Sequence, residues 1–144
     1  MIRKAESKDL PILAELACRL WPDNTVDEMC SEMGEIHAKP DAAIFLAYAE
    51  KVPIGFAQCQ LRHDYVEGTD SSPVGYLEGI YVTESYRHHG IAKRLLHACE
   101  AWAKEQGCTE FASDCELDNT QSLQFHLNVG FEEANRIICF TKKL

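Results

Sequence analysis

The sequence lacks the features of a membrane protein, a disulfide-bonded protein or a zinc protein. No apolar run approaches the roughly 18 residues that a membrane span requires, and residues 1–10 hold neither an apolar signal core nor an Arg- and Ser-rich transit pattern. None of the seven cysteines belongs to a C-x-x-C pair or to a ladder of close spacings. We therefore expect a cytoplasmic protein with reduced, buried thiols, no metal and no membrane partner.

Positive charge is also scarce in this chain. The 23 acidic residues outnumber the 14 basic ones and give a formal net charge of -9. Such a balance repels phosphate backbones and anionic lipid, which excludes nucleic acid or a membrane surface as the principal partner. A cationic small molecule would instead be attracted, although an acidic surface also serves solubility alone.

Linkers, repeats and low-complexity tracts are absent as well. A length of 144 residues lies close to the commonest domain size, and 46% hydrophobic residues is ordinary for a globular protein. The sequence therefore predicts one domain that spans residues 1–144.

The spacing of apolar residues predicts an alternation of helices and strands. Helical periodicity predicts helices over residues 10–21, 26–37, 91–103 and 120–127. Short apolar runs predict strands over residues 2–5, 42–49, 54–61, 76–82, 110–115 and 136–140. The second and third strands form an antiparallel hairpin, and an acidic loop follows over residues 62–75. This order indicates an α/β (α+β) fold with a central sheet and helices on its faces.

The junction between the strand at 76–82 and the helix at 91–103 has the chemistry of an anion site. A helix N-terminus presents unpaired N–H groups at the positive end of the helix dipole. Gly90 permits close approach of the backbone, Ala92 leaves room for a bulky anion, and Arg87 adds a charge-assisted contact. Many strand-to-helix junctions with a glycine bind nothing, so this pattern alone is weak.

Two motifs in order resemble the GCN5-related N-acetyltransferases. Arg87-x-x-Gly90-x-Ala92 resembles the acetyl-CoA pyrophosphate loop of that family, and Asn119, Ser122, His126, Gly130 and Phe131 are spaced like its Asn-x-x-Ala-x-x-x-Tyr-x-x-x-Gly-Phe block. The resemblance implies a mixed, mostly antiparallel sheet flanked by helices, with acetyl-CoA as cosubstrate and no metal. The cofactor-binding residues that it implies are Tyr81, Val82, Arg87, His88, His89, Gly90, Ile91, Ala92 and Asn119.

The second motif departs from the family pattern at two positions. Ser122 replaces the usual Ala, and His126 stands where many members carry the Tyr that donates a proton to the leaving thiolate. The resemblance makes His126 a candidate catalytic acid. A histidine packed on the helix face is the equal alternative.

Further blocks resemble the chromosomal-type aminoglycoside 6′-N-acetyltransferases. They are Trp21-Pro22, residues 62–68, residues 71–74, residues 77–80, Ala112-Ser113-Asp114 and residues 130–133. This resemblance implies acetyl transfer to the 6′-amino group of aminoglycoside antibiotics, the chemistry of antibiotic resistance. It also implies a homodimer formed through the C-terminal region, where the apolar strand at 137–140 contributes either to that interface or to its own sheet.

An aminoglycoside site requires carboxylates and aromatic rings, because the ligand is a rigid polycation with sugar faces. The candidate substrate-binding residues are Trp21, Tyr65, Glu78 and Asp114. Taken singly, each acid is better explained as a solvated surface charge, and Trp21 as a core residue at the end of a helix. Glu78 differs because it lies inside the apolar run at 76–82, where an unpaired carboxylate is costly to bury. Glu78 must therefore face a cleft or find a partner.

The predicted mechanism is direct attack of the amine on the acetyl thioester in a ternary complex. The amine must lose a proton, and Asp114 or Glu78 is expected to remove it directly or through water. Backbone N–H groups near Tyr81 and Val82 would polarise the thioester carbonyl. An acetyl-cysteine intermediate on Cys115 is disfavoured, because the sequence offers that thiol no evident activating partner.

Other functions remain open on the sequence. The same fold and chemistry would serve acetylation of another small amine or a polyamine. A chain of this fold without catalysis would be an acyl-CoA-binding module, but the presence of both Glu78 and Asp114 disfavours that interpretation.

Overall fold

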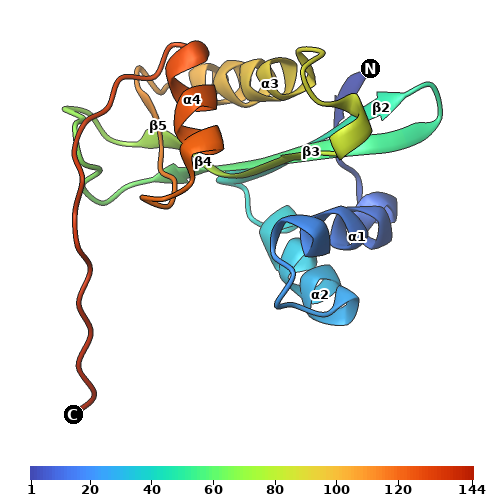
Figure 1. Ribbon diagram of the computed structural model, residues 1–144, viewed down its shortest axis with the longest axis horizontal. Helices are drawn as coiled ribbons and strands as arrows, with labels where there is room; N and C mark the ends of the chain where they lie inside the picture. Colours follow the sequence, from blue (N-terminus) through green and yellow to red (C-terminus); the bar gives the residue numbers. More distant parts are fainter.

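The computed structural model describes residues 1–144 and has a five-stranded sheet between two layers of helices (Figure 1). The strands are β1 (Ile2–Lys4), β2 (Ala42–Ala49), β3 (Val52–Arg62), β4 (Val74–Val82) and β5 (Phe111–Ser113); the α-helices are α1 (Leu10–Leu20), α2 (Val26–His37), α3 (Ile91–Glu105) and α4 (Thr120–Asn128). Two short 3-10 segments, η1 (Ser7–Asp9) and η2 (Glu84–Tyr86), precede α1 and α3. None of the helices is both long enough and apolar enough to cross a membrane.

The sheet is mixed and mostly antiparallel. Its strand order is β1-β2-β3-β4-β5, and only the β4–β5 pair is parallel. A parallel pair requires a crossover, which α3 supplies between β4 and β5. The predicted fold class, the hairpin and all four helices are confirmed, with boundaries that agree within two residues.

The two faces of the sheet carry separate apolar cores. Along β3, Phe56 packs toward α1 and α2, whereas Ala57 packs toward α3, because successive side chains of a strand point to opposite faces. Figure 1 shows α1 and α2 below the sheet and α3 and α4 above it. Burial on both faces explains why β2 and β3 appear in the sequence as nearly continuous apolar runs.

The predicted strand at 136–140 is wrong. No regular structure follows Asn128, and the chain after Phe131 is an extended tail that passes the loop at Glu67, to which Asn135 donates a hydrogen bond at 3.1 Å, and then leaves the domain (Figure 1). Ile137, Ile138 and Phe140 are 71%, 80% and 86% exposed. These residues have the composition of a strand, but a strand needs a neighbour for its backbone groups, and within this chain the tail has none.

The expectation of buried thiols is also wrong in part. All seven cysteines are free, and Cys59, Cys99 and Cys108 are buried in the core on the α3 face. Cys115 and Cys139, however, are exposed because they lie after β5 and in the tail.

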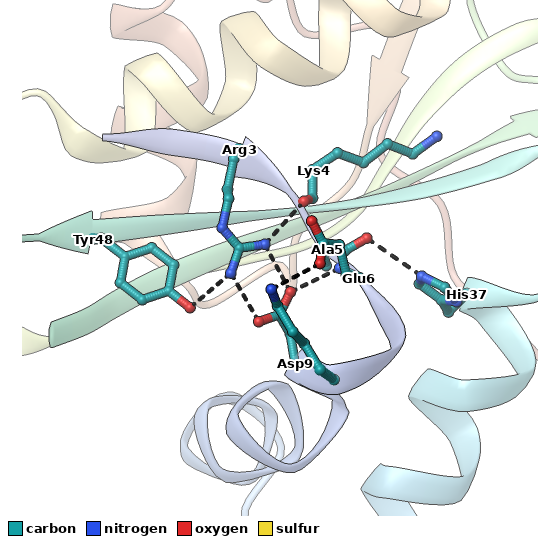
Figure 2. Close-up of polar contacts among 8 residues, drawn as sticks. Arg3, Lys4, Ala5, Glu6, Asp9, His37 and Tyr48 are labelled. Atoms are coloured by element: carbon teal, nitrogen blue, oxygen red, sulfur yellow. Dashed lines mark hydrogen bonds and ion pairs between the residues drawn. The ribbon is translucent and has the colours of Figure 1, made fainter. Parts of the chain in front are cut away.

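Figure 2 shows an ion-pair cluster that fastens the N-terminal strand to the helical layer below the sheet. Arg3 on β1 donates two hydrogen bonds to Asp9, at 2.7 and 2.8 Å, and a third to the Tyr48 hydroxyl at 3.2 Å. The Glu6 backbone N–H adds a bond to Asp9 Oδ2 at 2.7 Å. Asp9 is 3% exposed, and these donors compensate for the desolvation of its carboxylate.

We expect this cluster to make stability depend on acid pH. Arg3 lowers the pKa of Asp9 from 3.8 to about 2. Asp9 therefore contributes about 2 kcal/mol to the free energy of unfolding at pH values above its unfolded-state pKa. This contribution is lost as the pH falls from about 4 to about 2. Denaturant unfolding of Asp9→Asn should show this deficit at neutral pH and little of it near pH 2. The exposed Asp23→Asn is the control, and an equal deficit in both variants would contradict the assignment.

Candidate active site

Strands β4 and β5 pair only at their first residues. The register joins Gly75 to Phe111, Tyr76 to Ala112 and Leu77 to Ser113, and there the pairing stops. The second half of β4, residues 78–82, therefore has an edge with no neighbouring strand. Unpaired backbone groups on such an edge are available to a ligand.

The backbone N–H and C=O groups of Val82 both face this open edge. Thr83 N–H donates to Ile54 O on β3 at 2.7 Å, whereas Val82 O lies on the opposite side and accepts from Arg87 Nε at 2.7 Å. Because peptide groups alternate along a strand, the N–H of Val82 also points to the open edge, and that of Tyr81 points to β3. Of the two predicted oxyanion donors, Val82 has the suitable orientation.

Glu78 occupies a β-bulge in β4. Gln58 pairs with Gly79 and Cys59 pairs with Leu77, so Glu78 is an extra residue without a partner on β3. A bulge redirects the side chain of the extra residue and is frequent next to active sites. The side chain of Glu78 is 19% exposed.

Trp21 lies beside this bulge. A Cβ atom at Gly79 would come 2.6 Å from Trp21 Cη2, so only glycine leaves room for the indole there. The indole also packs edge to face against Phe56, with ring centroids 6.1 Å apart. The structure therefore places Trp21 against Gly79, the residue that follows Glu78 in the chain.

Arg62 and Tyr76 connect the two predicted acids, which gives a chain of four side chains. Arg62 donates from Nε and Nη2 to the two oxygens of Glu78, each at 2.9 Å, and its guanidinium lies 3.4 Å from the centroid of the Tyr76 ring. The Tyr76 hydroxyl donates a hydrogen bond to Oδ2 of Asp114. Burial and this bond to Asp114 raise the pKa of Tyr76, so its hydroxyl stays protonated and acts as a donor.

Sequence reasoning missed Arg62 and Tyr76. The signal that could have found Arg62 was Glu78, a carboxylate in an apolar run that requires a cation nearby. Arg62 ends the strand paired with β4, and its bond to Glu78 raises the pKa of the guanidinium. The expectation that Glu78 faces a cleft or finds a partner is confirmed by this ion pair.

The start of α3 keeps the geometry of an anion site. Gly90 is the N-cap residue with φ +79°, and a Cβ atom there would meet nothing within 4 Å. His88 also has a positive φ of 65°, and it is exposed like His89. The Nε of Arg87 donates a hydrogen bond to Val82 O. This nitrogen therefore stabilises the end of β4 and does not point toward an anion.

His126 and Asn119 both make contacts within the chain. His126 on α4 has Nδ1 at 2.7 Å from Ser122 O and Nε2 at 2.8 Å from Ser113 Oγ. Asn119 is the N-cap of α4, where its side-chain oxygen accepts from Ser122 N–H at 3.0 Å. Each residue therefore has a structural role beside its predicted functional one, and Ser113 links His126 to the strand that precedes Asp114.

Tyr65 stands apart from the other predicted site residues. It is 76% exposed on the acidic loop, and it forms no side-chain hydrogen bond or ring pair with Trp21 or with either acid. Its neighbour Val66 is buried against Val74 and Tyr76, which holds this part of the loop close to the four-residue chain.

Comparison with known proteins identifies the family. The pattern of the Acetyltransferase (GNAT) family matches residues 10–131, which include the open edge of β4 and the start of α3. The chain belongs to this acetyltransferase family. The resemblance deduced from the two sequence motifs is thereby confirmed.

Several aminoglycoside acetyltransferases of this family are similar along the whole chain. An aminoglycoside N(6′)-acetyltransferase type 1 from Acinetobacter haemolyticus is 40% identical over 143 residues, which cover 99% of this chain and 98% of the relative. One from Salmonella enteritidis is 42% identical over 142 residues, with the same coverage. These relatives also confirm the narrower resemblance to the aminoglycoside 6′-N-acetyltransferases.

A solved structure extends this similarity to the fold. The enzyme AAC(6′)-Iy, in complex with the bisubstrate analogue CoA-S-monomethyl-acetylneamine, superposes with a TM-score of 0.95 at 42% identity. The match covers 100% of this acetyltransferase and 98% of that chain. That relative therefore binds a bisubstrate analogue on this fold.

Proposed function

We propose that residues 1–144 act as one N-acetyltransferase domain that transfers an acetyl group from acetyl-CoA to the 6′-amino group of aminoglycoside antibiotics. The observation that carries the proposal is the pair of acids, Glu78 and Asp114, which Arg62 and Tyr76 connect where the open half of β4 begins, with Trp21 packed against the neighbouring Gly79. Carboxylates and an indole match the ammonium groups and sugar faces of an aminoglycoside. The seven free cysteines are compatible with the reducing cytoplasm as its location.

Acetyl-CoA fits the surface around the start of α3. The residues that would hold it are the predicted ones, namely Tyr81, Val82, the run from Arg87 to Ala92, and Asn119. Of these, Gly90 leaves the helix N-terminus uncovered. The unpaired edge of β4 offers backbone groups to the amide groups of the pantetheine arm. The thioester then lies near Val82, whose N–H stabilises the developing oxyanion.

Asp114 is the proton acceptor in this proposal. Both oxygens of Glu78 are engaged by Arg62, whereas Asp114 accepts one bond from Tyr76 and keeps Oδ1 free. Asp114 takes a proton from the ammonium group, and the amine nitrogen attacks the thioester carbonyl carbon. Collapse of the tetrahedral intermediate breaks the C–S bond and expels the CoA thiolate, and the nitrogen loses its second proton to solvent as the amide forms. Glu78 binds the substrate.

The thiolate takes up a proton at the end of the reaction. In this proposal His126 acts with both ring nitrogens protonated: Nε2 gives its proton to the Ser113 hydroxyl 2.8 Å away, the hydroxyl passes its own proton to the thiolate, and Nε2 takes up a new proton from solvent. The relay is needed because both ring nitrogens of His126 already have partners within the chain.

The function is tested by mass spectrometry of acetyl-CoA-dependent products with tobramycin, paromomycin and spermidine. We expect a single acetylation of tobramycin and none of paromomycin at its 6′ position, which carries a hydroxyl group. Mass detection avoids thiol reagents, with which the exposed Cys115 and Cys139 would react. Turnover of spermidine alone would assign the enzyme to polyamines. Binding of acetyl-CoA without any turnover would indicate an acyl-CoA-binding module.

We further propose that the protein is a homodimer that exchanges its C-terminal tails. The tail exposes Ile137, Ile138 and Phe140, and β5 is an edge strand. Beside β5 lies a hollow of about 280 Å³, lined in part by Ala103, Phe111, Val129 and Phe131. A partner's tail placed along β5 would bury these apolar groups and pair the free edge.

Light scattering after size-exclusion chromatography tests the exchange. We expect about twice the chain mass of 16.3 kDa for the wild type and the monomer mass for an Ile137→Asp/Phe140→Asp variant. Leu117→Asp changes an equally exposed apolar residue outside the tail and should remain dimeric. A wild-type monomer, or a tail variant that stays dimeric, would contradict the proposed interface.

A further inference from the structure

The Arg62–Tyr76 pair has a counterpart elsewhere in the molecule, and the comparison shows what is unusual about it. Arg3, Asp9 and Tyr48 also combine a guanidinium, a carboxylate and a phenol ring (Figure 2). There the carboxylate is 4% exposed, and its oxygens are filled by Arg3 and by the Glu6 N–H. That cluster has no capacity left for a ligand and serves the fold.

The cluster around Arg62 is built from the same groups but keeps hydrogen-bonding capacity that no residue of the chain uses. The Arg62 and Glu78 side chains are 38% and 19% exposed, and Asp114 is exposed with Oδ1 unpaired. The chain Glu78–Arg62–Tyr76–Asp114 also contains two carboxylates, one at each end. A buried structural ion pair needs only one. The second acid and the remaining lone pairs point to a ligand with several donors.

The geometry points to Arg62 as a positioning residue that, through the Tyr76 ring on which it stacks, fixes Glu78 and Asp114 at one separation for the ammonium groups of the acceptor. This inference rests on the proposed function. A rigid polycation gains most from carboxylates that are already in place, because no side-chain entropy is lost when it binds. The fork of Arg62 holds both Glu78 oxygens, and the stacked phenol fixes the hydroxyl that holds Asp114.

The bulge makes such an anchor necessary. Glu78 has no partner residue on β3, so strand pairing does not fix its backbone as firmly as that of its neighbours. Without Arg62, the chain that joins Glu78 to Asp114 would also contain two carboxylates and no cation. They would repel each other and separate, which spoils the spacing that the acceptor requires.

Steady-state kinetics of Arg62→Gln tests the inference. We expect the KM for tobramycin to rise about tenfold or more, because a charge-assisted anchor is lost, and the KM for acetyl-CoA to stay within about twofold. Arg62→Lys should recover only part of the loss, since an ammonium cannot bridge both Glu78 oxygens and stack on the ring. In a Glu78→Gln background, Arg62→Gln should have a smaller effect than in the wild type, because Arg62 acts through Glu78.

Arg3→Gln is the matched control, since it removes the same kind of pair away from the site. It should lower thermal stability and leave both KM values of the folded enzyme unchanged. A lower KM for tobramycin in Arg62→Gln would show that Arg62 competes with the acceptor, and an equal rise in both KM values would show a general structural defect. Either result, or wild-type kinetics, overturns the inference. Absence of tobramycin turnover by the wild type would overturn the proposed function, and this inference with it.

Discussion

Asp114→Asn should lower kcat/KM for tobramycin by about 100-fold or more and leave the affinity for acetyl-CoA within about twofold. The carboxylate of Asp114 accepts the Tyr76 hydroxyl at one oxygen and keeps the other free. An asparagine side chain of the same shape can still accept that hydroxyl through its carbonyl oxygen. It cannot take up a proton, so the ammonium group of the acceptor stays charged and unreactive.

The measurement separates binding from proton transfer. Steady-state kinetics gives kcat and both KM values, and calorimetric titration with CoA gives the cofactor affinity directly. Glu116→Gln is the control, because Glu116 is an exposed acid two residues further along the chain with no bond to Tyr76. A loss confined to Asp114→Asn supports its role as the proton acceptor. Wild-type kinetics of this variant would remove Asp114 from the site.

The parts of the structure that the sequence predicted depend on local patterns. The helix α3 shows apolar residues at helical spacing, and its N-cap is Gly90, the glycine that the sequence singles out at this strand-to-helix junction. Glu78 attracted notice because a charge inside an apolar strand is locally anomalous. Signals of this kind require only a short window of sequence and no knowledge of which strands are neighbours.

The parts that the sequence did not predict depend on strand partners. The bulge at Glu78 is a property of the β3–β4 register, and the Arg62–Glu78 pair joins residues 16 positions apart. The prediction of a strand in the tail is wrong because it, too, depends on a strand partner. Ile137 and Phe140 have the composition of a strand, yet the residue pattern does not say whether a neighbouring strand exists within the chain.

The second large effect concerns the start of α3. Gly90→Trp should abolish detectable binding of CoA, measured by calorimetric titration. The structure shows no atom within 4 Å of a Cβ atom at this position, so a side chain can leave the backbone here without a clash at its Cβ. The indole would cover the N–H groups of the helix N-terminus that are proposed to hold the pyrophosphate. Unchanged CoA affinity would place the pyrophosphate elsewhere.

A control at the other end of the same helix isolates this effect from backbone strain. Gly107 follows α3 with φ +91° and also has nothing within 4 Å of a Cβ atom, whereas Gly90 has φ +79°. A side chain in the left-handed region costs about 1 to 2 kcal/mol at either position, so Gly107→Trp and Gly90→Trp should lose similar stability in denaturant unfolding. Only Gly90→Trp should lose CoA, because the N–H groups that attract a pyrophosphate are unpaired at the N-terminus of a helix and paired at its C-terminus. If both variants lost CoA to the same extent, strain in α3 would explain the result and the anion site would not.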